Sequence, residues 1–97
     1  MSKLFIASYS GPEVDDRICG FFEDAQSYFW QLGFSVMLKG PEINFVSDGK
    51  KINITYNVPS ENELLLEGNG TGLGEEEIKA YASMLIAICK SHEFRML

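Results

Sequence analysis

Hydrophobic and polar residues alternate most regularly between Ile52 and Val58. Ile52, Ile54, Tyr56 and Val58 alternate there with Asn53, Thr55 and Asn57. A repeat of two residues is typical of a strand with one buried face and one face in water, as in an antiparallel sheet. Pro59 is predicted to end this strand, because proline has no backbone N–H to donate to a neighbouring strand.

Four other short apolar segments are predicted as strands: residues 3–9, 34–39, 42–47 and 63–67. The first of them contains three consecutive apolar residues, Leu4 to Ile6, rather than an alternation. Gly40-Pro41 predicts a turn and Asp48-Gly49 predicts a hairpin. The middle strands are therefore expected to be joined by tight connections.

A repeat of three and four residues predicts a first helix, from Ser10 as the N-cap to Leu32. Its apolar stripe consists of Val14, Ile18, Phe21, Phe22, Ala25, Phe29 and Leu32. Pro12 in the first turn and Glu13 three residues after Ser10 favour a capping box at this start. Gly33 is expected to end the helix. The opposite side is mainly anionic and carries Glu13, Asp16, Arg17, Gly20, Glu23, Asp24, Ser27 and Gln31.

A second helix is predicted from Glu75 to about Ser91, with an inner side formed by Ile78, Ala82, Leu85, Ile86 and Cys89. Glutamates in the first turn and Lys90 with His92 at the end suit the helix dipole. The predicted order is β-α-β-β-β-(β)-α in one domain, residues 1–97. Because each helix has a single apolar stripe, we expect an α+β fold in which two helices cover one face of an antiparallel sheet of three to five strands.

The charge balance changes which partners are expected. The chain has 14 acidic and 8 basic residues, for a net charge of −6. Such a surface repels nucleic acid and anionic membranes and favours a basic protein partner. The alternative interpretation is that the negative net charge only keeps the protein soluble. With no apolar run of membrane-spanning length and no leader pattern, a cytoplasmic location is expected. Cys19 and Cys89 are expected to be buried free thiols.

The sequence matches known catalytic and cofactor-binding motifs only weakly. Gly68 to Gly74 alternate with other residues but do not match GxGxxG, and this stretch is predicted as a flexible connector. His92 is the only histidine, and no nucleophile is placed beside it by the sequence. The carboxylate pairs lie on a solvated helix face, where a raised pKa is not expected. We therefore predict no enzymatic activity, no catalytic residues, no metal site and no cofactor.

The residues that remain as candidates for binding form two acidic groups and one aromatic anchor. Asp15, Asp16, Glu23 and Asp24 belong to the first helix, and Glu75, Glu76 and Glu77 begin the second. Carboxylates seven residues apart on a helix are separated by about 10 Å, which is of the order of the spacing of phosphates along a nucleic-acid strand. Trp30 lies about 100° from the apolar stripe, either at the edge of the core or exposed as a binding anchor.

In length, negative charge and mixed α/β layout, the chain resembles the small acidic phage-encoded anti-CRISPR proteins that mimic DNA and block the type I-F surveillance complex. The carboxylates named above carry this resemblance, through their charge rather than through a shared motif. The resemblance implies a stoichiometric inhibitor in the host cytoplasm. Its carboxylates would replace DNA phosphates opposite the lysine and arginine side chains of the complex.

Two other classes of function stay open at this stage. An immunity protein that neutralises a basic nuclease toxin would use the same electrostatics with a different partner. An enzyme or small-molecule-binding domain would instead be favoured by a pocket that includes Tyr56, Phe45 and polar residues. A continuous negative face without a pocket would count against this second class.

Overall fold

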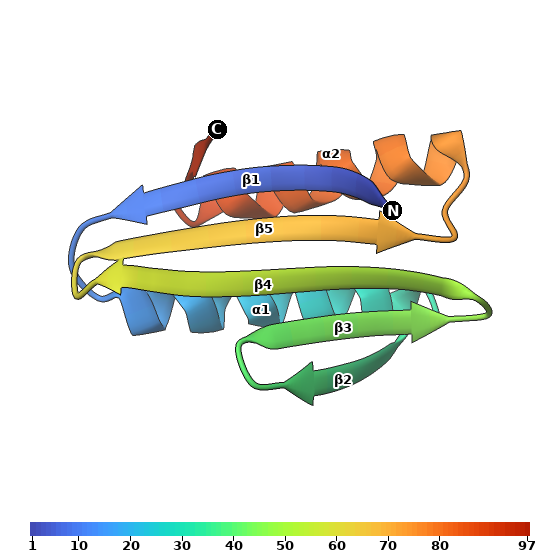
Figure 1. Ribbon diagram of the computed structural model, residues 1–97, viewed down its shortest axis with the longest axis horizontal. Coiled ribbons are helices and arrows are strands. Elements are labelled where there is room, and N and C mark those ends of the chain that lie inside the picture. The colour runs from blue at the N-terminus through green and yellow to red at the C-terminus, as the bar shows by residue number, and fades with distance from the viewer.

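A computed structural model describes all 97 residues of the chain. Its elements in chain order are β1 (Ser2–Ser10), α1 (Val14–Gln31), β2 (Ser35–Lys39), β3 (Glu42–Ser47), β4 (Lys50–Ser60), β5 (Glu63–Thr71), α2 (Glu75–Ser91) and β6 (Arg95–Met96). The strands form one sheet in the order β2-β3-β4-β5-β1-β6, in which all neighbours are antiparallel (Figure 1).

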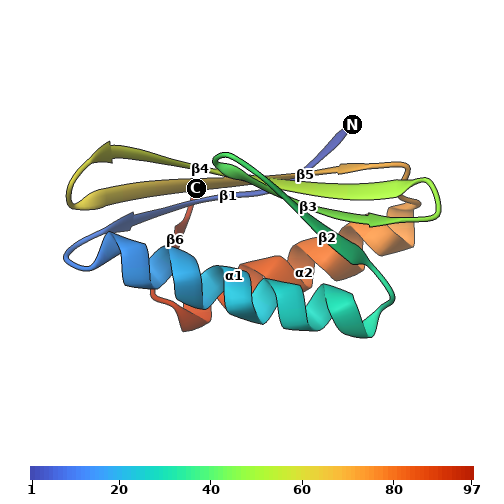
Figure 2. The ribbon, with the colours of Figure 1, turned by 90° about the horizontal axis from the view of Figure 1, so that it is seen from below.

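Both helices lie on the same face of the sheet and run in opposite directions (Figure 2). The predicted α+β class and the two-layer packing are therefore confirmed. The six strands exceed the predicted three to five. The additional strand is the two-residue β6, which pairs with the middle of β1 and is too short to produce a repeat in the sequence.

The core lies between α1, α2 and the sheet, and its centre is aromatic. The buried Phe29 of α1 has its ring centroid 4.7 Å from that of Phe45 on β3 and 5.3 Å from that of Phe34. About two turns earlier on the same face of α1, the ring centroid of Phe21 lies 6.0 Å from that of Phe5 on β1. Removing one such ring typically costs about 3–5 kcal/mol, so this stripe holds α1 in a fixed orientation on the sheet.

The start of α1 differs from the prediction. Ser10 is the last residue of β1, the helix begins at Val14, and the N-cap position is held by Glu13 with a left-handed φ of 62°. The predicted Ser10 capping box is therefore wrong. A turn occupies this segment instead, because the Tyr9 hydroxyl donates to the Pro12 carbonyl oxygen at 2.7 Å. The predicted end is confirmed, with Gly33 at a φ of 87° immediately after the helix.

A β-bulge explains the run of apolar residues at the beginning of the chain. The pairing of β1 with β5 shifts register between Lys3 and Phe5. Leu4 and Phe5 are consequently both buried, although adjacent residues of a regular strand face opposite sides. The three apolar residues in a row therefore mark an irregular strand rather than a weak one.

The glycine-rich stretch is not the flexible connector that the sequence suggested. Residues 68–71 belong to β5, and only residues 72–74 link this strand to α2. A Cβ atom at Gly68 would overlap the ring of Phe5, and one at Gly70 would overlap the side chain of Leu73. These glycines alternate because every second residue of β5 faces the core, where neighbouring side chains fill the space.

The two cysteines have different environments. Cys89 of α2 is fully buried, and this burial raises the pKa of its thiol to about 12. Cys19 is exposed on α1, so the expectation of two buried thiols is wrong for this residue. Cys19 is one position after the buried Ile18, and a step of about 100° around the helix moves it away from the sheet.

Substitution of Gly68 by alanine tests the packing explanation of the glycine stretch. The added methyl group would force the Phe5 ring to move, so we expect destabilisation of about 1–3 kcal/mol and a melting temperature lower by about 5–15 °C. Gly74→Ala is the control, because its Cβ would meet no heavy atom closer than 3.6 Å. Equal melting temperatures for the two variants would contradict this explanation.

Candidate interaction surface

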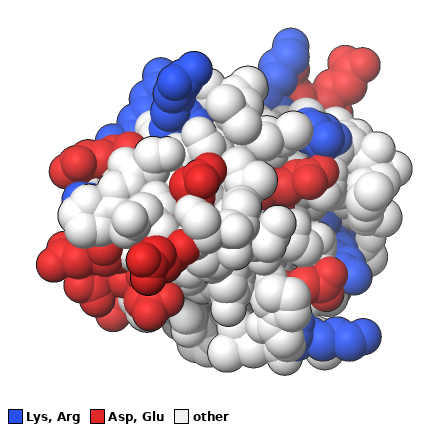
Figure 3. All heavy atoms as spheres, turned by 60° about the vertical axis from the view of Figure 1, so that its left-hand side comes forward, with Lys and Arg blue, Asp and Glu red and all other residues white.

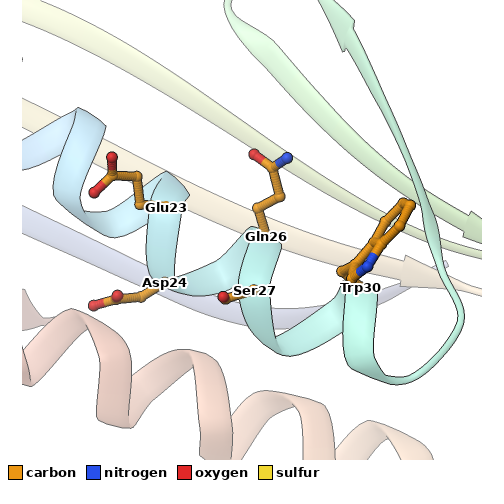
Figure 4. A pocket seen from close by; sticks show the side chains of 5 residues that line it. All are labelled: Glu23, Asp24, Gln26, Ser27 and Trp30. Carbon is orange, nitrogen blue, oxygen red and sulfur yellow. The ribbon is translucent and has the colours of Figure 1, made fainter.

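The outer face of α1 is polar and open to solvent. Glu23, Gln26 and Trp30 project from it, while Asp24 points toward the side of α2 (Figure 4). Together with Ser27 these residues line a hollow of about 660 Å³. All five come from one helix, so the hollow is a shallow surface along α1 rather than an enclosed site. Such a surface suits contact with another macromolecule better than the sequestering of a small molecule.

Trp30 is exposed, which decides between the two positions that the sequence left open. It retains 68% of its accessible surface, whereas the adjacent Phe29 has none. Trp30 therefore contributes little to the core. It lies 14 to 15 residues after Asp15 and Asp16, which corresponds to about 21–23 Å along the helix axis. The exposed tryptophan and the first acidic residues consequently occupy opposite ends of α1.

Asp24 has a partner within the chain. Its Oδ2 lies 2.7 Å from Nε2 of His92, which follows the end of α2. The imidazole packs against α1 at Gly20, where a Cβ would be only 2.8 Å from the ring. Gly20 thus provides the space for a contact between the two helices. Asp24 therefore connects α1 to the end of α2, and its carboxylate is only partly available to an external partner.

Arg17 makes a second connection at the same end of the helix pair. Its Nη2 lies 3.4 Å from the Glu93 carboxylate, and Nη1 donates to the His92 carbonyl oxygen at 3.4 Å. The guanidinium also lies 5.0 Å from the centre of the Tyr9 ring. Interaction with Tyr9, and then the charge of Glu93, raise the pKa of Arg17. The one basic residue in the first turns of α1 is therefore occupied by contacts within the chain.

The three glutamates at the start of α2 do not have the same role. Glu77 accepts a hydrogen bond from the backbone N–H of Gly74 at 3.0 Å and forms an ion pair with Lys50 of β4. The Gly74 N–H, followed by Lys50, lowers the pKa of the Glu77 carboxyl. Glu75 and Glu76 are exposed. Glu77 therefore caps the helix and ties it to the sheet.

The two acidic groups predicted from the sequence are separated in space. Because α1 and α2 run in opposite directions, their N-termini lie at opposite ends of the elongated molecule (Figures 1 and 2). Asp15 and Asp16 lie at the left-hand end in Figure 1, whereas α2 begins at the right-hand end, beside the β3–β4 turn. The helix packing does not merge the two groups into one continuous ladder of charge.

Acidic residues from other segments join Asp15 and Asp16 instead. The β4–β5 turn reaches the same end of the molecule and is held there by a hydrogen bond from the Gly11 N–H to the Asn62 carbonyl oxygen, at 2.8 Å. The segments at this end of the molecule carry six acidic residues, and we call the region the acidic end: Glu13, Asp15, Asp16, Glu61, Glu63 and Glu93. Figure 3, in which this end of the molecule comes forward, shows acidic side chains gathered at the lower left and basic side chains along the upper and right-hand borders.

Sequence reasoning missed Glu61, Glu63 and Glu93 as members of this surface. Glu61 lies in the turn between β4 and β5 and Glu63 directly follows it, 47 and 49 residues after the first residue of α1, and Glu93 comes after α2. The strands predicted at 52–58 and 63–67 contained a usable signal, since the segment between them carries acidic residues. The direction of that hairpin relative to α1 was not accessible from the pattern.

The remaining concave surface lies on the face of the sheet away from the helices. A hollow of about 250 Å³ is lined by Ile6, Thr55, Tyr56, Asn57, Leu65, Leu66, Glu67 and Leu97. Tyr56 borders this hollow, but its ring packs against Phe22 of α1 at a centroid distance of 5.8 Å, and Phe45 is fully buried in the core and does not reach the hollow. No group of three or more histidine, cysteine or acidic side chains is arranged to hold a metal ion.

Comparison with known proteins gives no relative for this chain. No model of a protein family matches the sequence, and no curated protein is significantly similar to it. Neither helix has both the length and the apolar character needed to cross a membrane.

The structural role of Glu77 can be tested through pH. Its pKa lies below the ordinary value of 4.5, so the charged carboxylate stabilises the fold above that pH, and this contribution is lost as the pH falls through the lowered pKa. We expect Glu77→Gln to lower the melting temperature at neutral pH, and the difference from the unmodified protein to shrink in acid. Thermal denaturation across pH measures this. Glu76→Gln is the exposed control, and equal effects of both substitutions at every pH would contradict the assignment.

Proposed function

We propose that the protein is a non-enzymatic binding inhibitor whose acidic end occupies a basic, DNA-binding groove of another macromolecule. In its most specific form, the proposal is that the groove belongs to a CRISPR-Cas surveillance complex of type I-F and that the protein acts in the host cytoplasm as an anti-CRISPR. Carboxylates would replace phosphates opposite lysine and arginine side chains and exclude the target DNA.

The observation that carries this proposal is the convergence of carboxylates at one end of the molecule. Three segments far apart in the sequence supply them: the start of α1, the β4–β5 turn and the residue after α2. The single arginine among them, Arg17, is bound to Glu93, His92 and Tyr9. Arg17 offsets the charge of Glu93, and the other five carboxylates of the acidic end have no ion pair within the chain, so the region keeps an excess of negative charge that favours encounter with a basic groove.

The acidic end is also well fixed, which matters for imitation of a ligand. α1 is held by its buried phenylalanines, the β4–β5 turn by the Gly11–Asn62 hydrogen bond, and Glu93 by Arg17. Charges that are fixed before contact lose little conformational entropy on binding. A surface that only keeps the protein soluble does not require its charged segments to be held in one arrangement. The fixed arrangement therefore favours a binding role over solubility alone.

The other predicted contact residues differ in how free their side chains are for a partner. Glu23 is exposed midway along α1 and extends the acidic end along that helix. Asp24 is partly occupied by His92, and Glu77 by Gly74 and Lys50. Glu75, Glu76 and Trp30 lie toward the opposite end. We therefore place Asp15, Asp16 and Glu23 at the centre of the proposed contact and treat the others as peripheral to it.

A pair of charge-matched variants tests this surface. Asp16→Asn with Glu61→Gln removes two charges from the acidic end, and Glu75→Gln with Glu76→Gln removes two from the other end. We expect the unmodified protein to prevent a purified type I-F surveillance complex from binding its DNA target in a gel-shift titration. The acidic-end variant should be about tenfold weaker, and the matched variant close to unmodified.

The dependence of inhibition on salt concentration provides a second measurement in the same experiment. An electrostatic contact should weaken as the salt concentration rises, and the acidic-end variant should show a smaller salt dependence than the matched one. Equal inhibition by the two variants would reject the acidic end as the contact surface. Absence of inhibition by the unmodified protein would reject this surveillance complex as the partner.

A further inference from the structure

The strand β2 is an unprotected edge of the sheet. It pairs only with β3, so its other side has no strand partner. Met37 and Leu38 in the middle of β2 are 59% and 76% exposed. Edge strands are commonly protected by short length, lysine, proline, a bulge or inward-pointing charge. β2 has five residues and ends in a lysine, but no proline, bulge or inward-pointing charge protects Met37 and Leu38. β2 has regular register with β3 throughout and a single charged residue, Lys39, at its end.

The turn that follows β2 determines which backbone groups face outward. Lys39 pairs with Glu42 across the two-residue connection Gly40-Pro41, in which Gly40 has a φ of 56°. A positive φ at the first position with proline at the second corresponds to a type II′ turn, whose flanking residues form a hydrogen-bonded pair. Hydrogen-bonded and non-hydrogen-bonded pairs then alternate along the ladder. The N–H and C=O groups of Val36 and Leu38 therefore point away from β3.

We propose that this edge binds a second copy of the chain, through antiparallel pairing of β2 with β2 about a twofold axis at Met37. In this register Val36 of each copy lies opposite Leu38 of the other, so the outward N–H and C=O groups of both residues are paired. Met37 faces its own counterpart as a non-hydrogen-bonded pair. The strand is thus complementary to itself, as a twofold interface requires.

The exposed apolar surface around β2 is of the size that such a contact needs. Trp30 projects from the end of α1 on the side of the β2–β3 hairpin (Figure 4), and Leu32 follows in the link between α1 and β2. Trp30 and Leu32 are 68% and 48% exposed. With Met37 and Leu38 they leave on the order of 500 Å² per copy, so the dimer would bury at most about 1,000 Å² from these side chains, at the lower limit for a specific interface.

The charge distribution favours a second copy in this arrangement. β2 lies away from the acidic end, toward the lower right of the molecule in Figure 1. A twofold axis at Met37 turns the second copy end for end, so the two acidic ends point in opposite directions, away from the shared β2 edge. Screening at physiological salt acts over about 8 Å, so their mutual repulsion is small.

Sedimentation equilibrium over a series of concentrations tests this proposal independently of the proposed function. We expect a reversible dimer for the unmodified protein and a monomer for Leu38→Lys, whose fold is checked by circular dichroism. Leu65→Lys is the matched control, because Leu65 is also an exposed leucine of the sheet but lies on the central strand β5. It should dimerise as the unmodified protein does. A monomer at all concentrations, or a dimer that survives Leu38→Lys, would overturn the proposal.

Disulfide formation tests the register itself. In a Cys19→Ser background, Met37→Cys should form a cross-linked dimer under mild oxidation, because a non-hydrogen-bonded pair has Cα atoms about 4.5 Å apart, within the range of a disulfide. Leu65→Cys in the same background should form no cross-linked dimer. Failure of Met37→Cys to cross-link, or equal cross-linking of both variants, would overturn the twofold register.

Discussion

Burial of the α1 phenylalanine stripe against the sheet is the interaction on which the other features depend. Phe21 and Phe29 are fully buried and contact rings from β1, β3 and the segment before β2. This packing fixes the rotation of α1 about its own axis. The same rotation directs Asp15, Asp16 and Glu23 to solvent and leaves Trp30 outside the core. A different rotation would bury charges without partners, at a large energetic cost.

Contacts between distant segments then complete the acidic end. Gly20 leaves room for the His92 ring, and Asp24 and Arg17 join α1 to the end of α2. These contacts explain why acidic residues near residue 15 and residue 93 share one surface. They also show that the carboxylates of this chain divide into two kinds. Asp24 and Glu77 hold the structure together, whereas Asp15, Asp16 and Glu23 face solvent without a recorded ion pair.

The sequence predicted the existence and type of the elements well where a single periodicity ran over many residues, as in α1, α2 and β4. Their ends were less accurate, since α1 begins at Val14 and β4 continues through Pro59 to Ser60. It failed where tertiary packing overrode local preference. Alternating glycines in 68–71 indicate flexibility by composition, but the space taken by Phe5 and Leu73 makes them part of a buried strand. Asp15 and Asp16 were accessible as candidates because one helix carries both. Glu61 and Glu93 were not, since their position depends on strand order and helix direction.

The two proposed surfaces occupy different ends of α1, and this separation has a consequence for how they would work together. The acidic end uses the first turn of the helix, whereas the β2 edge adjoins its last turn. Pairing through β2 would therefore leave both acidic ends free and carry them to opposite ends of one assembly. Two linked sites of this kind bind neighbouring grooves more tightly than one site does, because the second contact becomes intramolecular. A small domain of modest net charge could in this way compete with a long, highly charged nucleic acid, whose affinity also comes from many separate phosphate contacts.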